Sequence, residues 1–131
     1  MIGVDTNILV RYIAQDDAAQ SARATKLIEK ECDVANPGYI ALVVLVELVW
    51  VSESLYGATR GEVSAIVRRL LSIKQLVVQD AEVAWTELRA YESMTADFAD
   101  CLIASVNAAG GCDRTMTFDK RAAKAAMTLL R

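Results

Sequence analysis

The sequence of 131 residues contains no histidine. Without imidazole there is no Ser-His-Asp or Cys-His nucleophilic machinery, no histidine acid–base pair and no ordinary catalytic zinc site. Any catalysis must therefore depend on carboxylates, Lys, Tyr, Ser or Thr, or on a metal ion held by oxygen ligands. One proline and six glycines exclude a collagen-like or linker-rich organisation, and a hydrophobic content of 54% is sufficient for a core. We expect one domain, residues 1–131.

Basic residues and cysteines are also few. Fourteen Lys and Arg against 17 Asp and Glu leave a net charge of −3, which excludes nucleic-acid binding by bulk charge but not by a local basic patch. Cys32, Cys101 and Cys112 show no CxxC spacing and are odd in number, so neither a disulfide framework nor a zinc site is indicated. The longest apolar run, residues 39–50, is too short to span a bilayer, and we find no signal peptide. We expect a soluble, cytoplasmic protein with reduced thiols and no membrane association.

Short apolar runs alternate with segments of helical periodicity along the chain. Repeated strand–helix units of this kind predict the α/β class, with a parallel sheet and helices on both of its faces. Strands are expected at residues 1–4, 33–35, 76–78, around 116 and around 127–130. Helices are expected at residues 8–13, 18–31, 41–55, 59–71, 81–93, 97–109 and 120–126.

Two acidic residues directly follow expected strands. Asp5 ends the first apolar run, and Asp119 ends the segment Thr117-Phe118-Asp119. Ligand sites in parallel sheets gather beyond the carboxyl ends of the strands, so both residues are candidates for a functional site. The alternative for each is that it only caps the helix that follows. For Asp5 the two interpretations stay equally open.

Glu47 is a carboxylate in an unusual place. It lies between the apolar segments 42–46 and 48–51, in a helix that is apolar nearly all round, so we expect it to be buried. Burying an unpaired charge is costly, and buried carboxylates are therefore usually paired or bound to a metal. A structural ion pair or a protonated acid is the alternative to a functional role.

Asp97 and Asp100 lie three residues apart at the start of an expected helix and share a face. Asp97 is placed to cap the helix, next to the site, whereas Asp100 is placed to bind a cation. Four carboxylates from four separate elements (Asp5, Glu47, Asp100 and Asp119) can converge at one edge of the sheet. They would repel one another unless a hard cation such as Mg²⁺ or Mn²⁺ were bound. Such an ion polarises a phosphodiester and activates water without histidine, which points to metal-assisted phosphoryl hydrolysis.

Four motifs resemble the PIN domain, in the order and spacing of the VapC-type toxin ribonucleases. They are MIGVDTNILV at the start, VLVELVWV in the middle, and DFADCLIAS and TFDKRA near the end. The resemblance covers essentially the whole chain. It implies a three-layer α/β/α sandwich around a central parallel sheet, and a Mg²⁺- or Mn²⁺-dependent endoribonuclease (a hydrolase) that a cognate antitoxin inhibits. It also implies a second copy of the chain as partner, in a homodimer.

The resemblance assigns roles to individual residues. The family's four acids correspond to Asp5, Glu47, Asp100 and Asp119, which would be both catalytic residues and metal ligands. The residues that would orient a carboxylate or a water molecule beside them are Thr6 or Asn7, and Thr117. Contacts to RNA would come from local basic residues, of which the candidates are Arg11, Arg114, Lys120, Arg121 and Lys124. The alternative for these basic residues is an ordinary solvated helix face.

Other classes of protein are considered beside the toxin. The first is a housekeeping PIN ribonuclease without an antitoxin. A phosphotransferase with an aspartyl nucleophile is more distant, because it needs a second acid where this chain has Asn7. A non-catalytic interaction module, in which the acids form structural pairs, is the third. Apolar positions within residues 16–31, 41–56 and 63–71 exceed what one face of a sheet needs, which indicates an interface with a partner.

Overall fold

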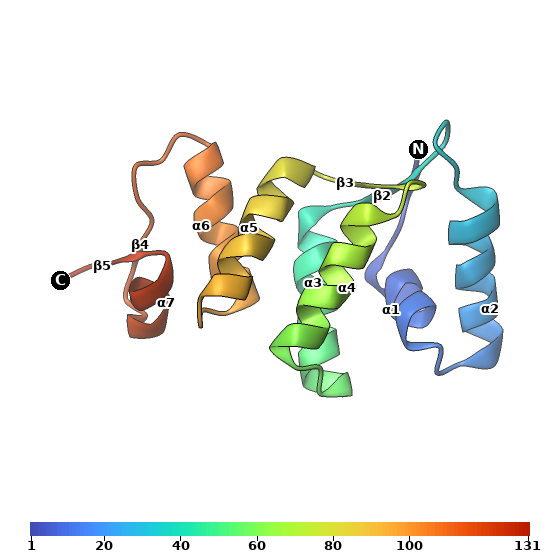
Figure 1. Ribbon diagram of the computed structural model, residues 1–131, viewed down its shortest axis with the longest axis horizontal. Helices are drawn as coiled ribbons and strands as arrows, with labels where there is room; N and C mark the ends of the chain where they lie inside the picture. Colours follow the sequence, from blue (N-terminus) through green and yellow to red (C-terminus); the bar gives the residue numbers. More distant parts are fainter. The chain divides into compact units, whose positions relative to one another are not determined.

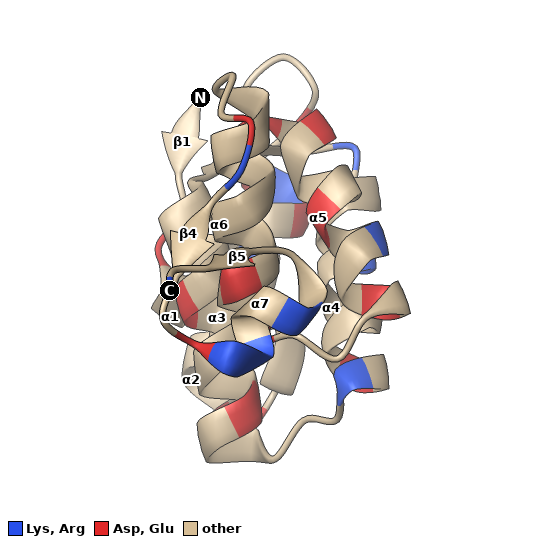
Figure 2. Cartoon of the chain, turned by 90° about the vertical axis from the view of Figure 1, so that its left-hand side faces the viewer, with Lys and Arg blue, Asp and Glu red and all other residues tan.

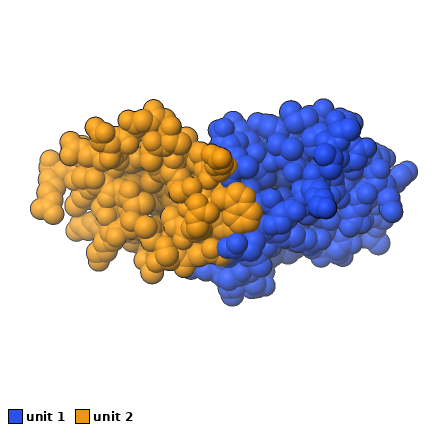
Figure 3. Space-filling view, turned by 45° about the horizontal axis from the view of Figure 1, so that its top comes forward, with its two compact units in different colours: residues 1–81 blue, residues 82–131 orange.

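The computed structural model describes all residues from 1 to 131. The chain divides into two compact units, residues 1–81 and residues 82–131, which are coloured separately in Figure 3. The expected alternation of strands and helices is present, and every strand pair is parallel. The α/β class is thereby confirmed. The five strands form one sheet of three strands and one of two.

The first unit is built on a parallel sheet with the order β1-β2-β3. Its strands are β1 (Ile2–Gly3), β2 (Gly38–Ile40) and β3 (Leu76–Val78). Gly38 pairs with both Ile2 and Leu76, and Ile40 pairs with Val78. Because the strands are parallel, their carboxyl ends lie at one edge, where the chain leads from β1 into α1 and from β2 into α3.

The position of the second strand corrects the sequence prediction. A strand was expected at residues 33–35, but these residues form a turn in which the Asp33 carboxylate accepts a hydrogen bond from the Asn36 amide at 2.7 Å. The strand begins instead at Gly38. A Cβ atom at Gly38 would lie 2.8 Å from Leu76 Cδ2 and 3.1 Å from Val4 Cγ2. The glycine is thus needed for close packing within the sheet, and it does not end the strand.

Helices surround this sheet within the first unit. They are α1 (Thr6–Ala14), α2 (Ala18–Lys26), a π-helical turn η1 (Leu27–Glu31), α3 (Leu42–Tyr56) and α4 (Arg60–Ser72). Helix α1 packs against α2 and α3, α3 packs against α4, and α4 packs against β3. Figure 1 shows α3 and α4 running side by side. The fully buried side chains of this unit include Leu9, Ile28, Ile40, Leu45, Val63, Val67 and Leu70.

Local sequence signals account for the ends of these helices. Asp17 accepts a hydrogen bond from the Gln20 amide at 2.9 Å and so caps α2. Thr59 and Glu62 form a reciprocal capping box at the start of α4. Helix α3 ends at Gly57, whose φ of +64° is a left-handed conformation that glycine adopts without strain. The first amide of α3, that of Leu42, donates to Gln79 Oε1 at 2.9 Å.

The second unit contains three helices and a two-stranded parallel sheet. They are α5 (Ala81–Ser93), which begins at the boundary, α6 (Phe98–Ala109), β4 (Met116–Thr117), α7 (Lys120–Ala125) and β5 (Thr128–Leu129). Tyr91 of α5 and Phe98 of α6 are both buried and meet edge to face, with their ring centroids 5.5 Å apart. Helix α6 ends at Ala109, where its sequence predicted the end, and Gly110 is its C-cap. None of the helices in the chain combines the length and apolar character needed to cross a membrane.

Candidate functional site

Asp5 stands where β1 passes into α1. It occupies the N-cap position with an extended backbone (φ −82°, ψ 162°), and its main-chain carbonyl accepts the first helical bonds, from the amides of Ile8 and Leu9. Its carboxylate makes no capping hydrogen bond and is exposed. The interpretation of Asp5 as only a helix cap is therefore weakened, because the carboxylate oxygens remain open to other partners.

Glu47 of α3 is held by Thr6 of α1. The Thr6 hydroxyl donates a hydrogen bond to Glu47 Oε1, and Thr6 itself is only 5% exposed. The residue immediately after Asp5 thus fixes the carboxylate of Glu47, which is 41 positions away in the sequence. This contact agrees with the orienting role that the resemblance implied for Thr6. Glu47 and Asp5 are thus the two candidate acids of the first unit, linked through Thr6.

The expectation that Glu47 is buried is wrong. The residue is exposed, and so are Val43 and Trp50 on the same face of α3, at 74% and 61%. An apolar helix does not have to be buried all round, because its sequence cannot tell which apolar side chains lie in solvent. The cost of burying a charge therefore gives no reason to assign Glu47 a functional role. The feature that distinguishes it from other exposed acids is the hydrogen bond from Thr6.

The second unit brings together three carboxylates at the start of α6 and of α7. Asp100 lies half-buried in the first turn of α6, and Asp97 and Asp119 are close enough for their charges to act on it. The pKa of the Asp100 carboxyl is raised above its ordinary value, first by burial and then by the negative charges of Asp97 and Asp119. The positive charge of Arg121 opposes this shift. A nearby cation would therefore favour the charged form of Asp100.

Asp97 takes the predicted position but not the predicted hydrogen bond. It is the N-cap residue of α6, with an extended backbone, yet its side chain accepts no bond from the helix. Its carboxylate instead lies 3.8 Å from an Arg121 guanidinium nitrogen, in an ion pair whose two partners are well exposed. The capping explanation therefore does not account for the carboxylate of Asp97, and a role beside Asp100 stays a prediction.

Asp119 does cap its helix. Its carboxylate accepts a hydrogen bond from the Arg121 amide at 2.8 Å, at the start of α7, and its own amide donates to Thr117 Oγ1 at 3.0 Å. The capping alternative for Asp119 is therefore present in the structure. The negative charge of Asp119 also raises the pKa of Asp100, so capping α7 does not prevent this carboxylate from acting on Asp100. Thr117 orients the Asp119 backbone and does not contact a carboxylate.

The acidic residues lie in two groups, Asp5 and Glu47 in the first unit and Asp97, Asp100 and Asp119 in the second. No three acidic or cysteine side chains gather closely enough to hold a metal ion by themselves. In its chemistry the set nevertheless suits a hard cation, because it offers only oxygen ligands. The half-buried Asp100, crowded by two like charges, is the observation that fits such a cation best.

The basic residues that were candidates for RNA contacts differ in their surroundings. Arg11 is tied to Asp16 by an ion pair at 2.9 Å and donates to Gln20 at 2.8 Å, and the hydrogen bond and charge of Asp16 raise its pKa. Arg114, Lys120 and Arg121 are exposed. Figure 2 shows basic residues in blue along α7. Lys120 and Lys124 of this helix line a shallow pocket of about 520 Å³.

Two features escaped the sequence analysis. Arg23 and Lys26 line a groove with Arg11 and Asn7 in the first unit; their i, i+3 spacing on α2 was the available signal. Glu87 on α5 is fully buried, no group donates a hydrogen bond to its carboxylate, and burial raises its pKa to about 8. Its spacing from the apolar Ala84 and Tyr91 could have indicated that it faces inward.

Comparison with known protein families identifies the class. The model of the PIN domain matches residues 2–127, and so spans both compact units; the chain belongs to the PIN domain family. PIN domains are generally nucleases, they typically bind a divalent metal, and the nuclease fold implies an RNA substrate. A search of curated proteins finds no match to the chain.

Proposed function

We propose that this chain is a divalent-metal-dependent endoribonuclease and the toxin of a toxin–antitoxin pair. The observation that carries the nuclease part is the state of Asp100, whose pKa is raised by burial and by the charges of Asp97 and Asp119. Such a carboxylate is unfavourable as an isolated anion and becomes favourable beside a cation. The match to the PIN domain over residues 2–127 supports the same reaction class. We further propose that residues 1–131 act as one domain.

The residues proposed to hold the metal are Asp5, Glu47, Asp100 and Asp119. When bound, Mg²⁺ or Mn²⁺ would supply positive charge for the scissile phosphate and acidify the attacking water. The chain's own contribution is to position the carboxylates: Thr6 orients Glu47, and Asp5 stands at the end of β1 with both oxygens uncommitted. Asp97, paired with Arg121, would add negative charge beside Asp100 and so strengthen the attraction for a cation there.

The toxin assignment rests on the order and spacing of the four acidic motifs, which resemble VapC-type toxins. The partner surface was expected to include the stripe of residues 63–71, but Val63, Val67 and Leu70 are fully buried and belong to the core. Helix α3, by contrast, does carry exposed apolar side chains, among them Val43 and Trp50. Exposed apolar side chains gathered on one face are typical of interfaces, and we propose that this face of α3 contacts an antitoxin or a second copy.

RNA cleavage is the direct test of the nuclease. Purified protein is incubated with total cellular RNA, with and without Mn²⁺ or Mg²⁺, and the new RNA ends are mapped. We expect discrete metal-dependent cuts that disappear in Asp100→Asn. Asp113→Asn, which removes an exposed carboxylate elsewhere in the second unit, is the matched control and should cleave normally. Cleavage that is independent of metal, or equal in Asp100→Asn, would contradict the proposal.

The toxin role has a separate test. Induced expression of the chain should arrest growth, and co-expression of the adjacent small gene should restore it and yield a complex in which light scattering detects more than one copy of the chain. Metal-dependent cleavage without growth arrest or a co-purifying partner would favour the housekeeping PIN ribonuclease. A protein that neither cleaves RNA nor is stabilised by divalent ions would be an interaction module.

A further inference from the structure

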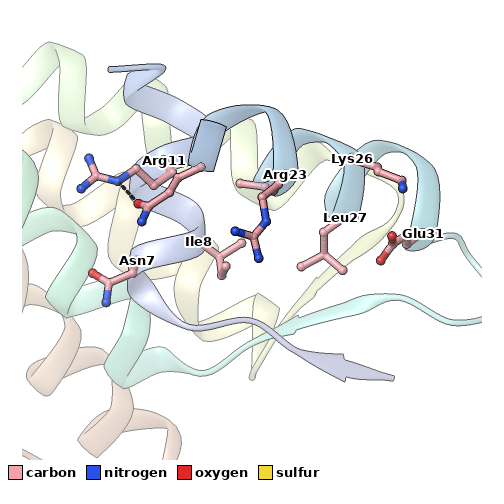
Figure 4. Close-up of a pocket in the computed structure, with 9 residues that line it drawn as sticks. Asn7, Ile8, Arg11, Arg23, Lys26, Leu27 and Glu31 are labelled. Carbon is pink, nitrogen blue, oxygen red and sulfur yellow. Dashed lines mark hydrogen bonds between the residues drawn. The ribbon is translucent and has the colours of Figure 1, made fainter. Parts of the chain in front are cut away.

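A groove of about 510 Å³ runs between α1 and α2 in the first unit (Figure 4). Its apolar lining comes from Ile8 on α1 and from Ala24 and Leu27 on the opposite side. The polar lining consists of Asn7, Arg11, Gln20, Arg23, Lys26 and Glu31. The groove therefore combines an apolar surface with three cationic side chains, although the chain as a whole carries a net charge of −3.

The three cations are not equivalent. Arg11 is neutralised and held in place by Asp16 and Gln20. Arg23 and Lys26 are exposed and enter no ion pair or hydrogen bond, so their charges are available to a ligand. In Figure 4 the Arg23 side chain points into the space beside Ile8. Glu31 lies with Lys26 at the end of the groove far from Asn7 (Figure 4).

The groove begins next to the acidic group of the first unit. Asn7, which lines it, directly follows Thr6, the donor to Glu47, and stands two positions after Asp5. Arg11 lies one helical turn further along α1, about 6 Å away along the axis. A linear polymer with one monomer bound at Asp5 and Glu47 could thus continue into the groove and remain on residues 1–81.

We propose that this groove binds the sugar–phosphate backbone of the RNA strand beside the cleavage site. Arg23 and Lys26 each contact a phosphate, Asn7 hydrogen-bonds the strand where it leaves the acidic group, and Ile8 and Leu27 contact the apolar faces of ribose or base. This inference rests on the proposed ribonuclease function. An anionic strand is favoured over an acidic protein segment because the two free cations lie along a path that starts at the carboxylates the substrate has to reach.

Salt dependence of RNA binding tests the groove. Each phosphate contact on a single strand contributes about 0.7 to the slope of log affinity against log salt concentration. Binding of a fluorescein-labelled single-stranded RNA is followed by fluorescence polarisation across a series of KCl concentrations. It is measured for the wild-type chain in EDTA, and for Asp100→Asn in Mg²⁺ to prevent cleavage. The double variant Arg23→Ala/Lys26→Ala should have a slope smaller by about 1.4 in both settings.

Two matched variants accompany it. Lys30→Ala/Lys74→Ala removes the same charge from exposed residues of the first unit that do not line the groove, and its slope should equal that of the wild type. Arg23→Lys/Lys26→Arg keeps both charges and should also retain the wild-type slope. Circular dichroism verifies that each variant folds. If the double alanine variant binds RNA with an unchanged slope, the groove is not on the RNA path, and an acidic polypeptide becomes its expected ligand.

The experiments distinguish failure of the groove proposal from failure of the proposed nuclease function. Cleavage of RNA together with an unchanged slope overturns the groove and leaves the proposed function intact. Binding that depends on Arg23 and Lys26, with no cleavage in any divalent metal, supports the groove and overturns the nuclease. A wild-type chain that binds no RNA even at low salt overturns both.

Discussion

The Thr6 hydroxyl donates a hydrogen bond to the carboxylate of Glu47 and so connects the start of α1 to the exposed face of α3. Thr6 is buried, whereas Glu47 is exposed, so the bond holds a charged side chain from its protein side and leaves its outer oxygen open. A carboxylate anchored in this way is oriented before any ligand arrives.

Removing the hydroxyl tests that orientation. Thr6→Val keeps the shape of the side chain and removes the donor, and we expect it to reduce metal-dependent RNA cleavage roughly 10- to 100-fold because Glu47 is no longer held. Thr6→Ser retains the hydroxyl and should keep most of the activity. Initial rates on a labelled RNA measure the effect, and thermal unfolding verifies the fold. Equal rates for the valine and serine variants would show that this bond is structural only.

Asp100→Asn should separate activity from stability. In the wild type the raised pKa of Asp100 means that its charged form is disfavoured in the folded state, so stability declines as pH rises above the ordinary range of an aspartate. The variant should therefore be at least as stable as the wild type at neutral pH without metal, while losing RNA cleavage.

Divalent ions provide the second half of this test. Mn²⁺ or Mg²⁺ should raise the melting temperature of the wild type by mass action and leave that of Asp100→Asn nearly unchanged. Asp97→Asn should lose less activity, since Asp97 is proposed to add negative charge beside the ion and not to bind it. A variant Asp97→Asn as inactive as Asp100→Asn would show that this division of roles is wrong.

Asp119 combines a cap with a charge, and two substitutions separate them. Asp119→Asn keeps an acceptor for the Arg121 amide but removes the negative charge, so α7 should persist and the pKa of Asp100 should fall. Asp119→Ala removes both functions and should also weaken α7, at a cost of about 1 kcal/mol. Carboxyl NMR titration of Asp100 measures the pKa, and amide exchange of α7 measures the cap. An unchanged pKa in both variants would exclude the electrostatic contact.

Glu87 predicts a pH dependence of stability that is independent of the proposed site. Its pKa is raised from an ordinary 4.5 to about 8 by burial, so the folded state binds the proton more tightly than the unfolded state. The free energy of unfolding is therefore unaffected below pH 4.5 and declines as pH rises toward 8. At about 1.4 kcal/mol for each pKa unit, the total loss is on the order of 5 kcal/mol.

A neutral side chain should remove this decline. We compare Glu87→Gln with the wild type by urea unfolding between about pH 5 and about pH 8. The variant should show a flatter dependence of stability on pH and a higher stability at the alkaline end. Glu82→Gln, an exposed acid on the same helix, is the control and should follow the wild type. Parallel wild-type and Glu87→Gln profiles would mean that Glu87 titrates as an ordinary exposed acid.

Much of the secondary structure was predictable because it depends on neighbouring residues. The N-caps at Asp17 and Thr59 and the glycine ends at Gly57 and Gly110 all involve groups within a few positions of one another. The parallel strand pairing followed from the alternation of strands and helices. The second strand was misplaced because Gly38 pairs with Leu76, a residue that is distant in the sequence.

The sequence by itself determined the chemistry available to this protein: oxygen ligands without imidazole, four acidic motifs in PIN order, and helices with defined ends. Only the tertiary structure decided which faces those side chains occupy. Glu47 proved exposed and tied to Thr6, Glu87 proved buried, and Arg23 and Lys26 came to line a groove with Asn7. The physical reason is that helical periodicity places residues on a common face, whereas the segment that packs against that face, or leaves it in solvent, is set by contacts between residues far apart in the chain.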